Sequence, residues 1–243
     1  VGEHARSVRE ALKLRRHIHL EPRVQGLQPA AASRRFPSYL APAMTQLPEL
    51  PLTLSRQEIR KMIRQRRRAL TPEQQQEMGQ QAATRMMTYP PVVMAHTVAV
   101  FLSFDGELDT QPLIEQLWRA GKRVYLPVLH PFSAGNLLFL NYHPQSELVM
   151  NRLKIHEPKL DVRDVLPLSR LDVLITPLVA FDEYGQRLGM GGGFYDRTLQ
   201  NWQHYKTQPV GYAHDCQLVE KLPVEEWDIP LPAVVTPSKV WEW

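Results

Sequence analysis

The segment of residues 187–197 contains the residue types that most directly indicate chemistry in this sequence. It reads Arg-Leu-Gly-Met-Gly-Gly-Gly-Phe-Tyr-Asp-Arg, so four glycines stand between Arg187 and Asp196. Glycine lets a backbone approach a ligand closely and adopt positive φ, and the amides of such a loop can surround an anion such as phosphate. A helix is predicted over residues 194–202, and its N-terminal end would face the same anion. Asp196, in the first turn of that helix, could hold a metal ion that bridges phosphates.

Two other phosphate-binding loops and a purely structural turn are the alternatives for this segment. A Walker A loop requires Gly-Lys followed by Ser or Thr, and it is excluded because Phe194 follows the last glycine. A dinucleotide fingerprint follows the first strand of a βαβ unit and precedes an acid by about 20 residues. Asp215 stands near that distance, but the segment lies late in the chain and follows the polar residues 181–186. A tight turn before a packed helix stays open as the structural alternative.

The composition is that of a globular protein. The 243 residues are 43% hydrophobic, which can supply a substantial core. No apolar run approaches the roughly 18 residues of a membrane span, and no signal-peptide pattern is found near the start. The single cysteine, Cys216, cannot form an internal disulfide, which agrees with a reducing compartment. We therefore expect a cytoplasmic protein without membrane association.

The positive charge of the sequence is concentrated near its start. The net charge is +4, and residues 1–51 hold eight Lys or Arg against four Asp or Glu, which leaves residues 52–243 neutral. Within residues 52–70, seven basic residues stand against Glu58 alone. Residues 1–51 lack sustained apolar periodicity, so we predict a disordered or loosely ordered tail there and a single domain over residues 52–243.

The predicted elements alternate between helix and strand. Ser55 and Glu58 predict a capping box for a helix that ends near residue 70, and Thr71 with Pro72 begins a second helix that ends near residue 87. A further helix is predicted at residues 110–120, and strands at 97–103, 123–129, 137–142, 171–176, 210–213 and 233–236. This order predicts a three-layer α/β/α fold, Rossmann-like, with a largely parallel sheet preceded by two N-terminal helices. Ligands of such folds bind beyond the strand C-terminal ends, where residues 104–107 and the glycine segment are expected.

Three motifs in order along the chain give the sequence its resemblance to a known family. They are the basic helix start Arg56-Gln-Glu-Ile-Arg60, the glycine segment preceded by Gly185, and the late acid Asp228. Over residues 55–236 the sequence resembles the 5-formyltetrahydrofolate cyclo-ligase family, also called methenyltetrahydrofolate synthetase. The resemblance implies conversion of 5-formyltetrahydrofolate to 5,10-methenyltetrahydrofolate, in which ATP becomes ADP and phosphate and Mg²⁺ is required.

The implied reaction has a simple physical logic. A formamide is unreactive because its nitrogen lone pair is delocalised into the carbonyl, and its oxygen is a poor leaving group. Phosphorylation of that oxygen reduces both obstacles, and the second folate nitrogen can then attack the carbon and expel phosphate. Such an intramolecular closure gains greatly from orientation. The protein therefore needs mainly to position two ligands and to stabilise phosphoryl charge.

The resemblance also implies roles for individual residues. Arg187, Tyr195 and Asp196 would be catalytic, and Asp196 with Asp228 would hold Mg²⁺. Glu107 would bind the folate ring, because a carboxylate can accept two parallel hydrogen bonds from an adjacent amine and N–H. The folate would also contact Leu102, Met190, Gly191, Gly192, Gly193 and Phe194. The ATP site would comprise Arg56, Gln57, Glu58, Ile59, Arg60, Arg187, Leu188, Gly189, Met190, Gly191, Gly192, Gly193, Phe194 and Tyr195.

Two positions depart from the family pattern. Family members commonly have lysine where Arg56 stands, so the charge is kept while the compact lysine contact is lost. Some relatives carry lysine where Gly192 stands. Without that lysine, more of the phosphate charge must be neutralised by Arg187, Arg197 and Mg²⁺. Arg197 could equally be the surface partner of a nearby acid.

Two other function classes remain open from the sequence. A phosphate-ligand isomerase or a coenzyme A transferase on a related α/β scaffold would use the glycine loop without needing Asp196 and Asp228. An RNA-binding protein would use the basic helix and the tail, but the neutral body and the lack of aromatic residues in that helix argue against nucleic acid. His214 and Cys216 are expected to be structural. We expect a monomer whose partners are 5-formyltetrahydrofolate and ATP.

Overall fold

The computed structural model describes residues 54–243, so the predicted tail lies outside the described residues. The helices are α2 (Arg56–Arg68), α3 (Pro72–Thr88), α4 (Pro90–Met94), α5 (Gln111–Arg119) and α6 (Phe194–Leu199). The strands are β1 (Thr97–Ala99), β2 (Arg123–Leu129), β3 (Leu137–Tyr142), β4 (Leu148–Met150), β5 (His156–Pro158), β6 (Val165–Leu166), β7 (Val173–Thr176), β8 (Ala180–Asp182), β9 (Arg187–Leu188), β10 (Gln208–Tyr212), β11 (Leu218–Val219), β12 (Ala233–Val235) and β13 (Val240–Glu242). Short 3₁₀ turns are η1 (Val162–Asp164), η2 (Leu168–Arg170), η3 (Trp202–His204) and η4 (Asp215–Gln217).

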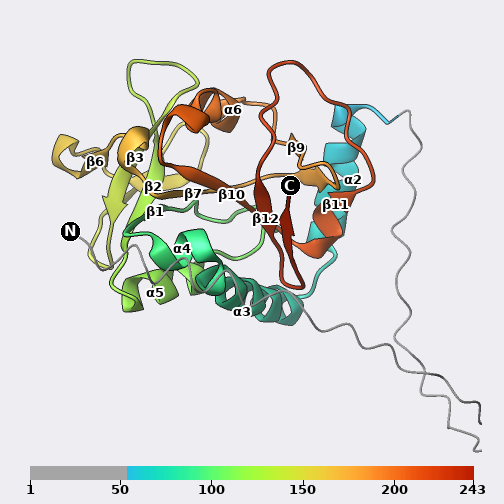
Figure 1. Cartoon of the computed structure of the whole chain (residues 1–243), viewed down its shortest axis with the longest axis horizontal. Coiled ribbons are helices and arrows are strands. Elements are labelled where there is room, and N and C mark those ends of the chain that lie inside the picture. The colour runs from blue at the N-terminus through green and yellow to red at the C-terminus, as the bar shows by residue number, and fades with distance from the viewer. Residues whose placement is uncertain (1–53) are drawn as a thin grey trace, which may run out of the picture. The chain divides into compact units, whose positions relative to one another are not determined.

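An eight-stranded sheet forms the centre, in the order β13-β12-β10-β7-β1-β2-β3-β6 (Figure 1). The strands from β12 to β2 pair in parallel, whereas β13, β3 and β6 pair antiparallel with their neighbours. Only the seven residues 130–136 separate β2 from β3, too few for the helical crossover that a parallel partner would need. The predicted α/β class is confirmed, and the antiparallel strands lie at the two edges of the sheet.

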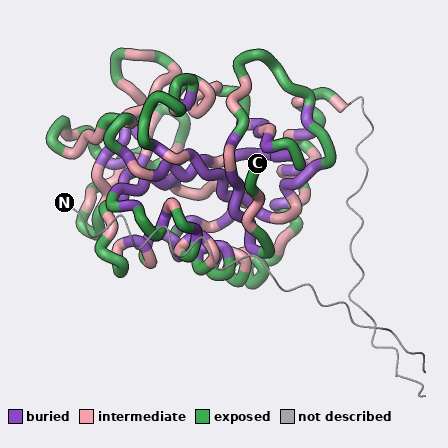
Figure 2. Tube along the Cα trace, viewed as in Figure 1, coloured by how far each residue is buried: buried purple, intermediate pink, exposed green. Residues whose placement is uncertain are grey.

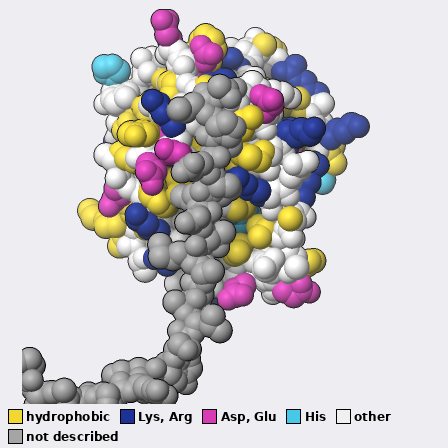
Figure 3. Space-filling view, turned by 90° about the vertical axis from the view of Figure 1, so that its right-hand side faces the viewer, with side chains coloured by type: hydrophobic (Ala, Val, Ile, Leu, Met, Phe, Trp, Pro, Cys, Tyr) yellow, Lys and Arg dark blue, Asp and Glu magenta, His cyan; other side chains and the backbone are white. Residues whose placement is uncertain are grey.

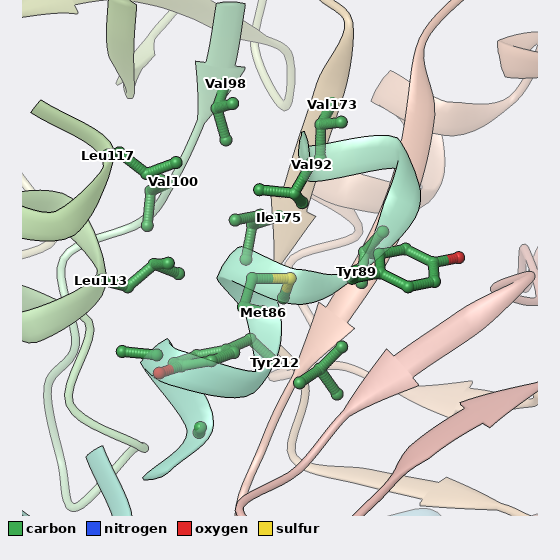
Figure 4. Close-up of a cluster of buried hydrophobic side chains, with 14 of the residues drawn as sticks. Met86, Tyr89, Val92, Val98, Val100, Leu113, Leu117, Val173, Ile175 and Tyr212 are labelled. Carbon is green, nitrogen blue, oxygen red and sulfur yellow. The ribbon is translucent and has the colours of Figure 1, made fainter. Parts of the chain in front are cut away.

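The two faces of the sheet are covered differently. Alternating side chains of β1 and β7 send Val98 and Val173 into one cluster and Ala99 and Leu174 into another. The first cluster packs against α3, α4 and α5, and includes the fully buried Met86 (Figure 4). The second packs against short turns and Leu199 of α6. Buried residues accordingly follow the central strands in Figure 2.

Helix α2 packs on a separate three-stranded sheet of order β11-β8-β9. Its capping box is present as predicted, with Ser55 N–H donating to Glu58 Oε2 at 2.8 Å. Ile59 and Ile63, four residues apart, are buried against Val179, Ala180 and Leu188. Because β9 leads directly into the glycine segment, this packing brings the basic helix to the loop.

Two predicted elements are shorter than expected by three residues or more. The strand predicted over residues 97–103 pairs only from Thr97 to Ala99, and the amide of Ser103 already bonds the side chain of Thr110 at 3.2 Å. The chain therefore leaves the sheet early and turns toward Glu107. The helix predicted over residues 194–202 ends at Leu199, and η3 follows it. None of the helices within residues 54–243 has the length and apolar character that crossing a bilayer requires.

Candidate active site

A cavity of about 400 Å³ opens at the C-terminal edge of the parallel strands. It lies between the segment after β1, the end of β2, the segment after β7 and the glycine loop, as expected for a ligand site in this kind of fold. Its polar groups are few, and they include Glu107, Arg187 and Asp196. Its apolar walls are made by Phe101, Leu102, Phe104, Leu126, Pro127, Leu129, Leu137, Leu153, Ile155, Pro177, Leu178, Met190, Phe194 and Tyr195.

The glycine loop, residues 189–193, is held in place by arginine side chains that donate hydrogen bonds to its carbonyl groups. Arg60 Nε donates to the carbonyl of Gly189 at 2.8 Å, and Arg197 donates to the carbonyls of Gly192 and, at 2.8 Å, Gly135. Gly191 and Gly193 have φ of 106° and 65°, in the range that favours glycine. Within residues 54–243, no acceptor pairs with the amides of residues 190–193. The loop therefore presents free donors, as the sequence predicted for an anion-binding loop. Arg197 pairs with carbonyls and not with an acid.

Two arginines and two aspartates alternate beside the loop. Arg187, 2% exposed, donates to Asp196, and Arg56 Nη2 donates to Asp228 Oδ1 at 2.9 Å. The amide of Ile229 donates to Asp196 Oδ1 at 3.3 Å, which ties the two pairs together. Because Ile229 follows Asp228 in the chain, both predicted metal ligands come to one place although 32 residues separate them in sequence.

Burial and the neighbouring charges in this cluster shift the pKa values of its members. Burial lowers the pKa of Arg187, although Asp196 and Asp228 act in the opposite direction. The hydrogen bond to Asp228 raises the pKa of Arg56. Burial opposes ionisation of Asp228, but the bonds from Arg56 and from the Glu225 amide hold its pKa below the ordinary value. Arg56 and Asp228 therefore stay charged near neutral pH.

The carboxylates fit a magnesium ion that is completed by ligand oxygens. Asp196 Oδ1 accepts from Arg187 and Ile229, whereas Oδ2 has no partner within residues 54–243 and the residue lines the cavity. Both carboxylate oxygens of Asp228 accept hydrogen bonds from Arg56, so a metal ion would have to share an oxygen that is already hydrogen-bonded. No cluster of three or more His, Cys, Asp or Glu exists in the described part of the chain. One or two carboxylates with phosphate oxygens and water are nevertheless a usual magnesium set.

Glu107 lies in a tight turn that borders the same cavity. Its Oε2 accepts from the amide of Phe104 at 3.2 Å, and Asp105 and Gly106 adopt φ of 52° and 73°. The side chain of Glu107 is 7% exposed, and burial raises its pKa to about 7, although the nearby Arg67 acts to lower it. A carboxylate in such a place can receive hydrogen bonds from a polar ring edge while the ring lies among apolar walls.

The structure brings most predicted ligand-binding residues together. The cavity is lined by Leu102 and Glu107 together with Met190, Phe194 and Tyr195. More than 80 residues of sequence separate the first two from the last three. The hydroxyl of Tyr195 is buried and has no partner within residues 54–243. It therefore offers an unused donor next to the cavity.

Three predicted nucleotide-binding residues on α2 have side chains that serve the fold. Gln57 Oε1 accepts from Arg60 at 3.4 Å, Glu58 completes the helix cap, and Ile59 is buried in the core. In α2, therefore, the guanidinium groups of Arg56 and Arg60 are the ones that reach the loop and its acids. Figure 3 views the side of the molecule where α2 lies in Figure 1, and Lys and Arg side chains are spread over it.

Sequence reasoning missed a whole wall of the cavity and one buried cation. The missed wall comes from the β4–β5 region and comprises Asn151, Leu153, Ile155, His156 and Glu157. Strands of three residues are too short to show a periodic pattern. The missed cation, Arg67, did have a signal, because it lies on the helix face of Arg60 and Arg64.

The fold and the site together define a class of protein. It is an α/β protein in which a glycine-rich loop with free amides borders a largely apolar cavity at the strand C-terminal ends. More particularly, the chain belongs to the 5-formyltetrahydrofolate cyclo-ligase family, whose sequence profile matches residues 53–237. The resemblance stated from the three motifs is therefore confirmed.

Individual relatives agree with this assignment. The chain is 53% identical over 179 residues to 5-formyltetrahydrofolate cyclo-ligase of Haemophilus influenzae, covering 74% of this chain and 96% of that protein. It is 31% identical over 188 residues to the cyclo-ligase of Mycolicibacterium smegmatis, covering 76% and 95%. The structure of Aquifex aeolicus 5,10-methenyltetrahydrofolate synthetase superposes with a TM-score of 0.67 at 28% identity, covering 78% of this chain and 93% of that one.

Proposed function

We propose that this protein converts 5-formyltetrahydrofolate to 5,10-methenyltetrahydrofolate, with ATP as the phosphoryl donor and Mg²⁺ as the metal. The observation that carries the proposal is the lining of one cavity, to which Glu107 and the glycine loop with Arg187 and Asp196 all contribute. The relatives that bear this name supply the substrate class.

The proposed reaction has two steps. The formyl oxygen attacks the terminal phosphorus of ATP, so a P–O bond forms and ADP leaves. The second folate nitrogen then attacks the activated carbon and loses its proton, the C–O bond breaks, and the methenyl bridge closes as the phosphate departs with that proton as hydrogen phosphate. Both steps need the formyl oxygen beside the terminal phosphate, and the cavity supports this because Met190 and Phe194 line it from the glycine loop itself.

The loop amides and the arginines are proposed to bind the phosphates. Free amides of residues 190–193, with Arg187 beside them, would stabilise the charge on the transferring group. Arg60 would keep the loop in place through Gly189, and Arg56 would approach the nucleotide near Asp228. Mg²⁺ held by Asp196, with Asp228 beside it, would neutralise part of the phosphate charge.

Glu107 and the apolar walls are proposed to bind the folate. An ionised Glu107 would accept the ring amine and the adjacent N–H, while Leu102 and Phe104 would pack against the ring. The raised pKa of Glu107 shows that its charged form is poorly solvated before binding. A ligand that donates two hydrogen bonds would therefore replace missing solvation.

The test is absorbance in the methenyl-folate band after the protein is mixed with 5-formyltetrahydrofolate, ATP and Mg²⁺, with each component omitted in turn. Product only in the complete mixture supports the proposal. If the folded protein binds ATP but forms no product, the proposal is rejected. Dependence on Mg²⁺ also separates it from the isomerase and transferase alternatives. We also propose that the protein is a cytoplasmic monomer, and light scattering tests the monomeric state.

We expect kcat/KM for 5-formyltetrahydrofolate, measured at saturating ATP, to fall as the pH drops below about 7, by about tenfold per pH unit. The reason is that Glu107 must be ionised to accept hydrogen bonds, and its carboxyl becomes protonated below its pKa of about 7. A Glu107→Gln variant, which does not titrate, is the control. A profile that stays flat down to pH 5.5 would contradict the assigned role.

Gly191→Ala should raise the KM for ATP by on the order of tenfold, because the alanine would strain a loop held at φ 106° by about 1–3 kcal/mol. A Cβ there would lie 3.7 Å from Arg60, so strain and not a clash would cause the effect. Gly121→Ala is the matched control, since Gly121 has φ 73° and open space around a Cβ. Equal KM values for both variants would show that the loop geometry is unimportant for ATP.

A further inference from the structure

Helix α2 carries a row of arginines that contacts both the glycine loop and the turn that carries Glu107. Arg56, Arg60, Arg64 and Arg68 recur every four residues, so they lie on one side of the helix. The first two contact Asp228 and the glycine loop, as described above. The later ones converge on Asp105, with Arg68 Nε donating to its Oδ1 at 2.8 Å and Arg64 Nε 3.6 Å from its Oδ2. One rigid helix therefore contacts the nucleotide end and the turn that carries Glu107.

Arg67, next to this row, is the most deeply buried of these arginines. Its side chain is 1% exposed, and Nη2 donates to the carbonyl of Asp105 at 3.1 Å. Nη1 lies 3.9 Å from Oε1 of Glu107. The backbone fits closely as well, because a Cβ at Gly106 would lie 3.4 Å from Cβ of Arg67. Arg67 thus contacts each residue of the turn 105–107.

Helix α3 reinforces the same contact. Gln75 Nε2 donates to the carbonyl of Arg67 at 3.2 Å and to that of Gly106 at 3.3 Å. The turn needs such support, because Asp105 is held in the left-handed region, which costs a residue with a side chain of order 1 kcal/mol or more. Two helices therefore fix the position from which Glu107 extends.

The cost of burying Arg67 argues for a role beyond stability. Its Nε and Nη1 are buried without a hydrogen-bond partner in residues 54–243. Unpaired buried donors are costly, and an apolar side chain of similar size is often at least as stabilising in such a place. A cation next to a buried carboxylate is understandable when the carboxylate must be charged to work.

The charged surroundings of Glu107 make Arg67 the dominant cation. Arg67 and the more distant Arg64 favour its charged form from α2, and Asp105 on its own turn disfavours it. Tyr195 of α6 is near enough for the charge of Glu107 to raise its pKa. His214 lies against the backbone of Gly106 and Glu107, and its pKa is lowered to about 4 by burial and by Arg67, so it is neutral at pH 7.

We propose that Arg67 is a positioning residue for the folate: it fixes the 105–107 turn and supplies the positive charge that lets Glu107 be buried as an anion facing the cavity. This inference rests on the proposed function. It predicts that loss of Arg67 affects the folate end of the site and spares the nucleotide end, although α2 contacts both.

The experiment compares Arg67→Met and Arg67→Lys with Lys61→Met, an exposed cation on the same helix. For Arg67→Met we expect the KM for 5-formyltetrahydrofolate to rise at least tenfold, the KM for ATP to change less than twofold, and the acid limb of kcat/KM to move to higher pH by about one unit. Arg67→Lys keeps the charge, so its pH profile should stay near that of the wild type while its folate KM rises a few-fold. Lys61→Met should match the wild type.

A turnover-free measurement accompanies the kinetics. The increase in Tm caused by 5-formyltetrahydrofolate should shrink in Arg67→Met, most strongly at low pH, while the increase caused by ATP should be retained. A lower Tm with unchanged KM values and pH profile would overturn the inference, and so would equal losses for both substrates. If Arg67→Met does not fold, an unchanged folate KM in Arg67→Lys would overturn it. If the wild-type protein forms no methenyl-folate, the proposed function is overturned and this inference with it. If the wild type is active and Arg67→Met has the same KM values and pH profile, this inference alone is rejected.

Discussion

Replacing Asp196 by asparagine should lower kcat at saturating ATP and 5-formyltetrahydrofolate by on the order of 100-fold or more. The substitution removes the carboxylate that has a free oxygen toward the cavity, and with it the proposed ligand for Mg²⁺. It also removes the charge that compensates buried Arg187, which would then be free to shift away from the phosphates. Titration of Mg²⁺ is the deciding measurement, and the variant should need much more metal for its residual activity.

The structure predicts a loss of stability in the same variant. Arg187 is almost fully buried, and removing one partner of a buried ion pair costs about 3–5 kcal/mol. An asparagine oxygen can still accept the hydrogen bond, so the lower end of that range is expected. Thermal unfolding with and without ATP measures the effect and shows whether the variant is folded during the assay.

Asp161→Asn is the matched control, because Asp161 also pairs with an arginine but does so on the surface, away from the cavity. It should change neither turnover nor metal requirement. Wild-type turnover by Asp196→Asn at limiting Mg²⁺ would contradict the metal assignment.

Glu107→Gln should reduce kcat/KM for 5-formyltetrahydrofolate by on the order of 100-fold, since a charge-assisted hydrogen bond contributes about 1.5–3 kcal/mol. Glutamine keeps the shape of the side chain but offers one acceptor oxygen and one amide donor, and the donor would face a ring group that also donates. The KM for ATP should change little, because within residues 54–243 Glu107 makes no hydrogen bond or ion pair with the glycine loop or Arg187. Equal losses for both substrates would indicate misfolding instead.

The same variant should be more stable than the wild type at high pH. The folded-state pKa of Glu107 is raised to about 7 from 4.5, so its contribution to folding is present below pH 4.5 and is lost as the pH rises through 7. Glutamine avoids this loss, and the advantage of the variant should grow to on the order of 3 kcal/mol between pH 4.5 and pH 8. Denaturant unfolding at both pH values measures it, and an advantage that shrinks with pH would contradict the buried, charged state of Glu107.

Local signals in the sequence determined the first two predicted helices and the backbone conformation of the glycine loop. The capping box at Ser55 forms as predicted, and a second one forms at Thr71, where the second helix was predicted to begin, because each bond joins residues three apart and needs no distant partner. The positive φ of Gly191 and Gly193 follows from glycine itself. The family, too, was indicated by three short motifs, and it is confirmed over residues 53–237.

Tertiary structure alone decided which residues meet. The cavity wall of residues 151–157, the pairing of Asp228 with Arg56, and the contact of Arg67 with the Glu107 turn all join segments that are distant in sequence. The contacts of Arg56 and Arg67 depend on the small β11-β8-β9 sheet, which holds α2 beside the loop through strands of two or three residues. Such strands are too short to be periodic, and they exist only because their residues are buried against Ile59 and Ile63. Sequence thus indicated the groups that we propose to do chemistry, while long-range burial decided their arrangement.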